Sequence, residues 1–416
     1  MAEAVLNDTQ PPLPNAVTCA LDDIDVSDPR MLERNCWQPY FARLRAEDPV
    51  HYHAESPFGA YWSVTRLDDI KAVDMNHQVY SSEPVIVIGD PAEDFDIPMF
   101  IAMDPPRHDE QRKGVQPAVA PRQLANLEPV IRERVADILD GLPVGEPFDW
   151  VSTVSVELTT RMLATLFDVP FEDRHKLPFW SDCATSSPQT GGLTMPEEER
   201  RAHLLECLEY FTQLWQRREK EPGQDFVSMM AHSPAFKNMS PMEYLGNLVL
   251  LIVGGNDTTR NSISGGILAL NTWPDEYQKL RDDPTLIPNM VSEIIRWQTP
   301  LAHMRRTAAC DAELAGRKIS KGDRVVMWYV SGNRDEAHFE DADRLIIDRP
   351  NARSHVSFGY GIHRCMGNRL AEMQLRVAWE EILKRFHTVE LVGEPTRVSS
   401  NFVKGYTQMP VVLHPH

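Results

Sequence analysis

One cysteine of this chain stands in a setting that restricts how the surrounding backbone can fold. Cys365 follows two glycines, Gly359 and Gly361, and precedes a third, Gly367. Glycines at this spacing allow a tight loop whose backbone approaches a flat ligand closely. A helical pattern begins directly afterwards, and the helix dipole and nearby donors favour the thiolate form of a thiol placed there. The segment therefore indicates a thiolate ligand, with a buried structural cysteine as the alternative.

The remaining cysteines and the charge exclude several classes of protein. The six cysteines include no Cys-x-x-Cys pair, which argues against a zinc ribbon, and a disulfide framework is not expected in 416 residues. Acidic residues outnumber basic ones by 61 to 42, so the net charge is −19. A chain this acidic is a poor binder of nucleic acid or of an anionic membrane surface.

The N-terminal region has no features of a secretion signal. Residues 1–15 contain neither a basic segment nor an apolar run, and the longest apolar stretch, 248–253, is too short to cross a bilayer. We therefore expect a cytoplasmic monomer without a membrane span. Residues 1–30, dotted with proline and aspartate, predict an extended N-terminal arm, and residues 31–416 predict a single domain.

Two kinds of hydrophobic periodicity alternate along the chain. Strand-like alternation occurs near 48–66 and 304–330. Apolar residues recur at three- and four-residue steps in the segments 127–142, 153–167, 196–219, 241–272, 284–298 and 367–386. We find no internal repeat and no change of composition that would mark a linker. The pattern predicts a mainly α fold with small β-sheets to one side.

The cysteine loop matches a long and specific signature. Phe358, Gly361, His363, Cys365 and Gly367 occupy the positions of Phe-x-x-Gly-x-His/Arg-x-Cys-x-Gly. In this signature the chain resembles the cytochrome P450 family. The resemblance implies the cytochrome P450 fold, haem b as the cofactor, and Cys365 as the metal ligand, whose thiolate donation favours O–O cleavage. It also implies that Phe358 and Gly367 contact the haem.

The helix predicted over 241–272 contains a second motif, in which Gly254 and Gly255 precede Asp257 and Thr258. Glycine inside a helix costs roughly 1 kcal/mol relative to alanine, so the stretch predicts a kink or an opened hydrogen bond beside a small ligand. An acid beside a hydroxyl can relay protons, although a glycine-rich helix crossing with a solvated aspartate is the alternative. The resemblance implies the oxygen-activation motif of the family, with Asp257 and Thr258 as the catalytic acid and alcohol.

A third motif places basic side chains on one helix face. His108 and Arg112 are four residues apart after a pair of prolines, which by itself predicts a solvated basic face. The resemblance implies instead that both bind the haem propionates, since arginine suits bidentate contact with carboxylates. By the same resemblance, Arg306 and His363 complete the propionate-binding set.

Glu293 and Arg296 form the fourth motif. Residues three apart share a helix face, and alone this pair would be a surface ion pair worth about a few tenths of a kcal/mol. In its position between the other motifs it resembles the Glu-x-x-Arg pair of the family. The resemblance implies a structural role, in which the pair locks its helix to the segment that contains 333–335 and Phe339.

Apolar residues gather where family members line the substrate pocket, although core packing is the alternative for each of them. The expected lining residues are Ile86, Val87, Ile88, Met99, Phe100, Leu250, Leu251, Gly254, Leu301, Met304, Phe402 and Val403. A pocket with few polar anchors suits a hydrophobic substrate. The amino-acid sequences of 103–121, 250–266 and 357–375 resemble those of the bacterial subgroup of this family that hydroxylates the terminal methyl of medium-chain alkanes and fatty acids. A cyclic hydrocarbon or terpenoid is the alternative substrate.

The resemblance also implies the partners. Besides O2, it implies a ferredoxin and an NAD(P)H-dependent ferredoxin reductase as electron donors. A ferredoxin is acidic, so a basic patch is expected on the thiolate side of the haem, built from Arg112, Lys113, Arg364, Arg369 and Arg376. The rival functions are a peroxide-driven enzyme of the same fold and a non-catalytic haem-thiolate sensor. Neither would need the acid–alcohol pair.

Overall fold

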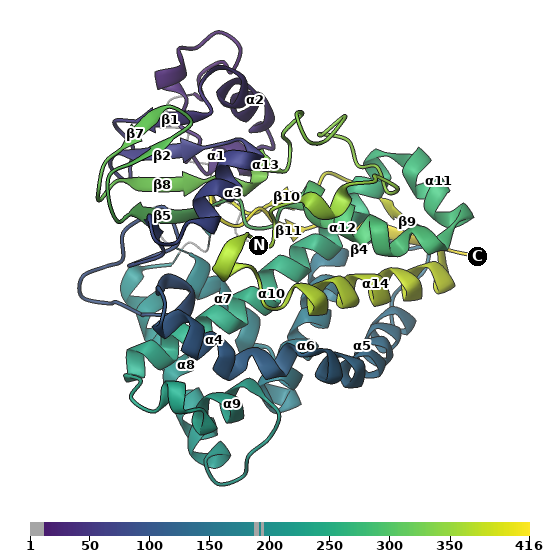
Figure 1. The fold of residues 1–416 in the computed structure, drawn as a ribbon. Coiled ribbons are helices and arrows are strands. Elements are labelled where there is room, and N and C mark those ends of the chain that lie inside the picture. The colour runs from purple at the N-terminus through teal and green to yellow at the C-terminus, as the bar shows by residue number, and fades with distance from the viewer. Residues whose placement is uncertain (1–11, 187–190, 193–194) are drawn as a thin grey trace.

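The protein is described here from a computed structural model, which defines residues 12–186, 191–192 and 195–416. Helices form most of the molecule, and the largest sheet lies to one side of them (Figure 1). The α-helices are α1 Arg30–Glu33, α2 Gln38–Glu47, α3 Leu67–Met75, α4 Arg107–Val115, α5 Pro121–Asp140, α6 Val156–Phe167, α7 Lys176–Thr185, α8 Glu197–Arg218, α9 Phe226–His232, α10 Pro241–Thr272, α11 Pro274–Asp282, α12 Ile287–Gln298, α13 Tyr329–Gly332 and α14 Asn368–Arg385. Each helix predicted from the sequence is present, so the mainly α fold class is confirmed.

The largest sheet joins segments that are far apart in the sequence. Its five strands follow the order β1-β2-β8-β5-β3, and β2 pairs with β8 in parallel while the other pairs are antiparallel. The strands of the described residues are β1 Val50–His53, β2 Tyr61–Val64, β3 Tyr80–Ser81, β4 Phe148–Asp149, β5 Met304–Ala308, β6 Ala312–Leu314, β7 Arg317–Ile319, β8 Arg324–Met327, β9 Phe386–Leu391, β10 Thr396–Arg397, β11 Tyr406–Gln408 and β12 Pro410–Pro415. The sheet brings the two strand-like regions of the sequence together.

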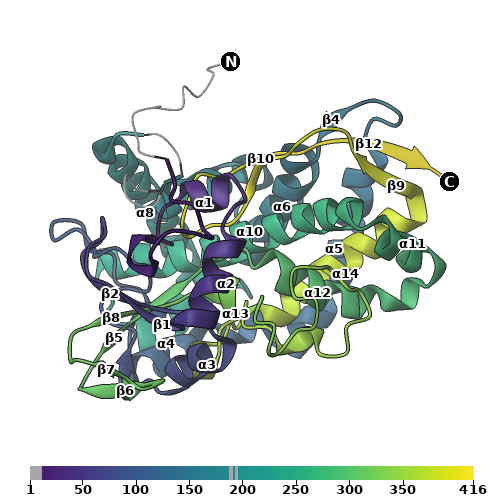
Figure 2. The ribbon, with the colours of Figure 1, turned by 90° about the horizontal axis from the view of Figure 1, so that it is seen from above.

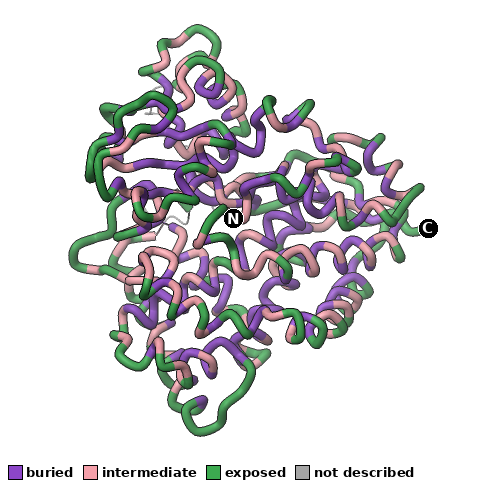
Figure 3. The backbone as a smooth tube through the Cα atoms, in the orientation of Figure 1, coloured by how far each residue is buried: buried purple, intermediate pink, exposed green. Residues whose placement is uncertain are grey.

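The helix α10 is the centre of the helical part. It packs against α6, α7, α12 and α14, and most of its residues are buried. Figure 3 shows the buried residues, in purple, concentrated on the central helices and the sheet. Such a helix is apolar on most of its circumference because neighbours surround it, which explains why its sequence carries the longest apolar run.

Part of the predicted N-terminal arm is packed against the domain. Ile24 and Val26 are buried in one cluster with Trp37 and Phe41, and the Tyr40 hydroxyl donates to a main-chain carbonyl of the arm at 2.6 Å. Figure 2 shows this segment beside α1 and α2. Residues 12–29 are therefore docked on the domain, because a few apolar side chains suffice to hold an irregular segment. Residues 1–11 lie outside the described residues.

Among the described residues, no helix is both long enough and apolar enough to pass through a membrane.

Candidate active site

A cavity of about 740 Å³ is lined by Cys365 and by residues of α10. Cys365 and its neighbours form one wall, α10 contributes another, and the loop 84–102 covers a third. The cavity also reaches α7 and α8, so it is bounded by elements from most of the chain. The sequence motifs of the central helix and of the cysteine loop thus meet at a single space.

The cysteine loop has the tight geometry that its glycines predict. Gly359 and Gly361 have φ angles of +67° and +66°, a region that other residues rarely adopt. A side chain on Gly361 would place Cβ 2.4 Å from the main-chain oxygen of Asp74. The Cys365 N–H donates to the Phe358 carbonyl at 2.7 Å, which closes the loop before α14 begins. The loop therefore presents Cys365 at the cavity wall.

The pKa of the Cys365 thiol differs from the sequence expectation. Cys365 is exposed to the cavity, and desolvation by the protein around it raises this pKa, whereas the N–H groups of Gly367 and Asn368 and the charges of Arg112 and Arg364 lower it. Desolvation is the largest influence, so the expectation that the helix dipole and nearby donors lower the pKa of this thiol is wrong. A metal ion deprotonates a thiol that coordinates it, and the same donors would then stabilise the bound thiolate.

Four basic residues meet at the cavity as the resemblance implies. His108, Arg112, Arg306 and His363 all line it, and the two imidazole rings lie 4.2 Å apart. His108 Nε2 and His363 Nδ1 are buried without a hydrogen-bond partner. Buried polar atoms normally have partners, so these two nitrogens indicate that a polar ligand group belongs here. The carboxylates of haem fit this set.

The polar surroundings of His363 orient its ring. Ser82 Oγ lies 2.8 Å from His363 Nε2, and the Ser82 N–H donates to Asp104 at 3.0 Å. Burial, followed by the charge of Arg306, lowers the pKa of His363 to about 2, so the imidazole is neutral. When Ser82 donates to Nε2, the ring proton lies on the orphaned Nδ1, where it can be donated to a carboxylate.

The Gly254–Thr258 motif lines the cavity from α10. Thr258 Oγ1 donates to the Gly254 carbonyl at 2.9 Å, and a Cβ at Gly254 would meet no atom within 4 Å. The motif lies within one uninterrupted helix, α10, which runs over residues 241–272. The glycine leaves open space on the helix surface beside the threonine.

Asp257 points away from the cavity that Thr258 lines. Its side chain is fully buried, accepts a hydrogen bond from Ser181 Oγ at 2.8 Å, and forms an ion pair with Arg260. Arg260 also pairs with Asp182 of α7 at 2.9 Å. Burial raises the pKa of Asp257, whereas Arg260 lowers it. The alternative of a solvated aspartate is therefore excluded, and the acid and the alcohol lie on different sides of the helix.

The Glu293–Arg296 pair is buried rather than exposed. Both side chains have 0% exposure, and two hydrogen bonds of 2.7 Å join them. Arg296 also donates to the carbonyls of Asn333 and Ala342 at 2.7 Å, and its guanidinium lies over the Phe339 ring. The surface ion pair considered from the sequence is wrong, and the contacts reach the segment that the resemblance implies.

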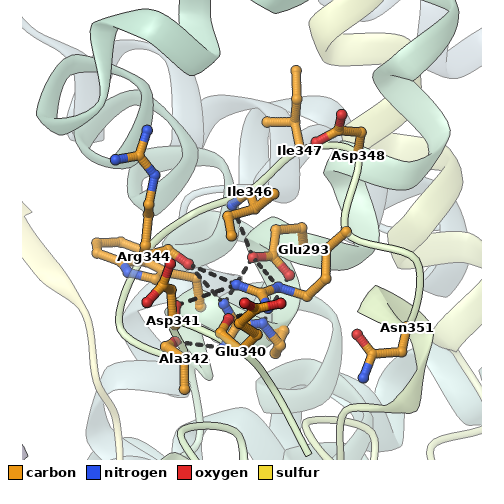
Figure 4. Close-up of polar contacts among 12 residues, drawn as sticks. Glu293, Glu340, Asp341, Ala342, Arg344, Ile346, Ile347, Asp348 and Asn351 are labelled. Carbon is orange, nitrogen blue, oxygen red and sulfur yellow. Dashed lines mark hydrogen bonds and ion pairs between the residues drawn. The ribbon is translucent and has the colours of Figure 1, made fainter. Parts of the chain in front are cut away.

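A further arginine completes this network. Arg349 Nε donates to Glu293 at 3.0 Å, and the Ile346 N–H donates to the same carboxylate oxygen (Figure 4). The segment 340–351 wraps around Glu293 and supplies carbonyl and N–H groups to it and to its partners. Sequence reasoning missed Arg349, because no periodic pattern connects an irregular segment to a helix 56 residues earlier.

Most of the apolar residues expected in the pocket line the cavity. They are Ile86, Val87, Met99, Phe100, Leu250, Leu251, Gly254, Leu301, Met304 and Phe402, together with Phe358 and Gly367 of the cysteine loop. Ile88 and Val403 do not line it. Ile88 packs in the core with Trp328, and Val403 forms a bridge with Leu301 behind the wall. For these two residues the alternative of core packing holds.

Charged residues at one part of the cavity were also missed. Arg201 of α8 forms two hydrogen bonds to Asp94, at 2.7 and 3.0 Å, and a third to Glu197 at 2.8 Å. Arg200, Arg201 and Glu197 line the cavity. The cavity is therefore less uniformly apolar than expected. No sequence pattern indicated the contact between Arg201 and Asp94, because the loop and the helix meet only in the folded chain.

Known proteins are similar to this chain over nearly its whole length. The family model described as Cytochrome P450 matches residues 197–408. The chain is 36% identical over 406 residues to linalool 8-monooxygenase from Pseudomonas putida, which covers 94% of this chain and 99% of the relative. It is 31% identical to methyl-branched lipid omega-hydroxylase from Mycobacterium tuberculosis, with coverage of 89% and 90%.

Solved structures give the same result. CYP153D17 from Sphingomonas sp. PAMC 26605 is 50% identical and matches with a TM-score of 0.90, over 95% of this chain and 100% of the other. The cysteine loop, the orphaned nitrogens and these relatives agree, and this chain belongs to the cytochrome P450 family of haem-thiolate monooxygenases.

Proposed function

We propose that this enzyme hydroxylates the terminal methyl group of medium-chain alkanes or fatty acids, with haem b as cofactor and reduced ferredoxin as electron donor. The observation that carries the proposal is the cavity, which joins Cys365 on one wall to Thr258 and apolar side chains on the others. A relative named as a methyl-branched lipid omega-hydroxylase supports the same class of substrate and position.

The residues of the chain divide the work of holding the cofactor. Cys365 would bind the iron, and His108, Arg112, Arg306 and His363 would bind the propionates through their cavity-facing groups. When bound, the haem activates O2 so that one oxygen atom enters a substrate C–H bond and the other leaves as water. Leu250 and its apolar neighbours would exclude water and hold an alkyl chain by dispersion and burial.

Thr258 and Asp257 would deliver protons to the cavity. The Thr258 hydroxyl can hold a proton at Oγ1, where it now donates to the Gly254 carbonyl. Asp257 occupies the preceding position of the helix, and its carboxyl group contacts the Ser181 hydroxyl and the Arg260 guanidinium on the side that faces α7, so it would have to turn from Arg260 towards Thr258 to pass on a proton. The presence of an acid and an alcohol at these two positions supports a monooxygenase over the peroxide-driven enzyme and the sensor, neither of which needs a relay.

The relay gives the first prediction. Thr258→Ala is expected to keep normal haem content but to release most of the electrons from NADH as reduced oxygen species, so product per NADH should fall several-fold. Asp257→Asn should slow turnover, because the carboxylate that carries the proton is gone while its shape remains. Product and NADH are measured together, and Thr258→Ser, which keeps the hydroxyl, is the control. Unchanged product per NADH in Thr258→Ala and unchanged turnover in Asp257→Asn would contradict the relay.

Electron delivery gives the second prediction. Arg369 is exposed on the helix that follows Cys365, whereas Arg376 is already paired with Glu128 and Glu380 at 2.8 Å. Arg369→Glu is therefore expected to lower ferredoxin-driven turnover and the dependence of that turnover on salt, since rim charges act on association. Substrate affinity should stay unchanged.

The matched control for Arg369→Glu is Lys318→Glu, an exposed charge reversal on β7 of the two-stranded β6-β7 sheet. Stopped-flow reduction by a ferredoxin at several ionic strengths measures the effect. Equal kinetics for both variants, or a change in substrate affinity alone, would show that the ferredoxin binds elsewhere.

The substrate is tested by spectral titration and product analysis. Octane, octanoic acid and linalool are added to the ferric enzyme, and the ferredoxin-driven products are identified. The proposal expects a spin-state shift and a terminal alcohol from octane or octanoic acid. A terpenoid is the second candidate, because linalool 8-monooxygenase is similar over 94% of this chain. Turnover of linalool without turnover of either linear compound would replace the first proposal by the second.

A further inference from the structure

A buried carboxylate next to the cofactor cavity has no role in the function proposed so far. Asp74 lies near the end of α3 and is 1% exposed. Its Oδ1 accepts a hydrogen bond from Arg306 Nη2 at 2.7 Å, and the two charged side chains are both buried. Arg306 itself lines the cavity, so the carboxylate stands directly behind a cation of the propionate-binding set.

The second oxygen of Asp74 contacts two other elements. Oδ2 accepts from the Tyr329 hydroxyl at 2.6 Å and from the Tyr360 N–H at 3.0 Å. Tyr329 begins α13, and Tyr360 belongs to the loop that carries Cys365. One side chain therefore connects the strand of Arg306, the start of α13 and the thiolate loop.

Two glycines of the cysteine loop, Gly359 and Gly361, permit the contact of this loop with Asp74. A Cβ at Gly361 would lie 2.4 Å from the Asp74 carbonyl oxygen, and one at Gly359 would lie 3.3 Å from the Tyr329 hydroxyl. A substituted loop could not approach α3 so closely. The glycines that give the signature its tight turn thus also bring the loop within hydrogen-bond distance of Asp74.

The groups around the buried Asp74 carboxylate affect its pKa in opposite directions. Burial raises the pKa of Asp74, and Arg306, Tyr329 and the Tyr360 N–H oppose that rise. A buried ion pair is maintained only when its remaining lone pairs are also satisfied, as they are here. Without the carboxylate, the Arg306 guanidinium would keep its hydrogen bond to the Arg305 carbonyl at 2.8 Å but would lose the ion pair that directs its other amino group at the cavity wall.

We propose that Asp74 is a positioning residue of the cofactor site, which orients Arg306 towards the propionates and anchors the loop that presents Cys365. The proposal rests on the haem-binding role of this cavity but not on the substrate, so it is tested without substrate. Asp74 acts through Arg306 and through the Tyr360 N–H, and it does not touch the reacting atoms.

The test compares Asp74→Asn with a matched control. Glu276→Gln removes the charge of another buried carboxylate, one that also accepts from a cation, Lys279, and from a main-chain N–H, that of Ile347, but does not line the cavity. Transfer of haem to apomyoglobin measures its dissociation. We expect Asp74→Asn to accelerate haem loss roughly tenfold, the size of one hydrogen bond to a charged group, and Glu276→Gln to leave it unchanged.

Two further readouts separate positioning from plain destabilisation. Asp74→Asn should raise the reduction potential of the haem iron, because a negative charge near it is gone, and should lower the fraction of the ferrous–CO complex with the thiolate-type spectrum. In an Arg306→Gln background, Asp74→Asn should add less to haem loss than it does in the native enzyme. If Asp74→Asn lowers only the thermal stability, as Glu276→Gln does, the proposal is overturned.

A milder variant covers the case in which Asp74→Asn does not fold. Tyr329→Phe removes one hydrogen bond to Asp74 and keeps both charges. It should accelerate haem loss about threefold, in the same direction as Asp74→Asn. Haem loss at the native rate in Tyr329→Phe would likewise overturn the proposal.

Discussion

Cys365→Ala is expected to eliminate the thiolate-type spectrum of the ferrous–CO complex and to abolish substrate hydroxylation. Among the residues that the structure describes, Cys365 is the one cysteine that lines the cavity, so no other described thiol can take its place. The backbone should tolerate the change, because the loop geometry depends on Gly359 and Gly361 rather than on the sulfur. Cys365→His should still hold haem but should not support hydroxylation.

The matched control is Cys310→Ala, which removes an exposed thiol in the bend that follows β5. It should retain the spectrum and the turnover of the native enzyme. Ferrous–CO difference spectra and haem content per protein are measured on all three variants. A thiolate-type spectrum in Cys365→Ala would mean that the haem ligand has been assigned to the wrong residue.

Arg296→Ala is expected to destabilise the protein by about 3–5 kcal/mol, the usual cost of breaking a buried charge pair. The change leaves the Glu293 carboxylate buried with only Arg349 as a cationic partner and removes the bonds to the carbonyls of Asn333 and Ala342. Asn333 in turn donates to Ser357 Oγ at 2.8 Å, at the start of the thiolate loop. Haem incorporation should therefore fall together with stability.

The control for this prediction is Arg317→Ala, which removes the exposed partner of Asp48 at 2.7 Å. An exposed ion pair is worth about 0.2–1 kcal/mol, so the loss in Arg296→Ala should be several times larger. Urea unfolding of the haem-bound protein gives both values. A loss in Arg296→Ala no larger than that in Arg317→Ala would contradict the structural role of the buried pair.

Helices and strands could be predicted from the sequence because their signals are local. The segment 241–272 predicted from the apolar spacing matches α10 at both ends. Such a prediction succeeds because apolar residues recur along the sequence wherever a helix buries one of its faces. The cysteine signature was equally local, and it indicated a tight loop before the structure placed Gly359 and Gly361 at positive φ. Features that depend only on residues close together in the sequence could therefore be predicted.

Which side chains are buried, and which way they point, could not be predicted from local sequence patterns. Glu293 and Arg296 look like any exposed pair on a helix, and they are fully buried because Asn333, Phe339 and the segment 340–351 fold over them. Asp257 and Thr258 are adjacent in sequence, yet the helix turns one towards α7 and the other into the cavity. Which side chains are buried depends on which helices and strands pack together, and that packing is cooperative over the whole chain.

The sequence by itself therefore determined the mainly α fold class, the tight loop that carries Cys365 and the family. Only the tertiary structure decided that Asp74 stands behind Arg306, that residues 12–29 dock on the domain, and that Ile88 belongs to the core. Asp74 and Arg306 are 232 residues apart, and their contact exists because β3 and β5 pair and α3 packs beside them. Contacts of this kind depend on loop closure and side-chain packing, which leave no periodic signal in the chain.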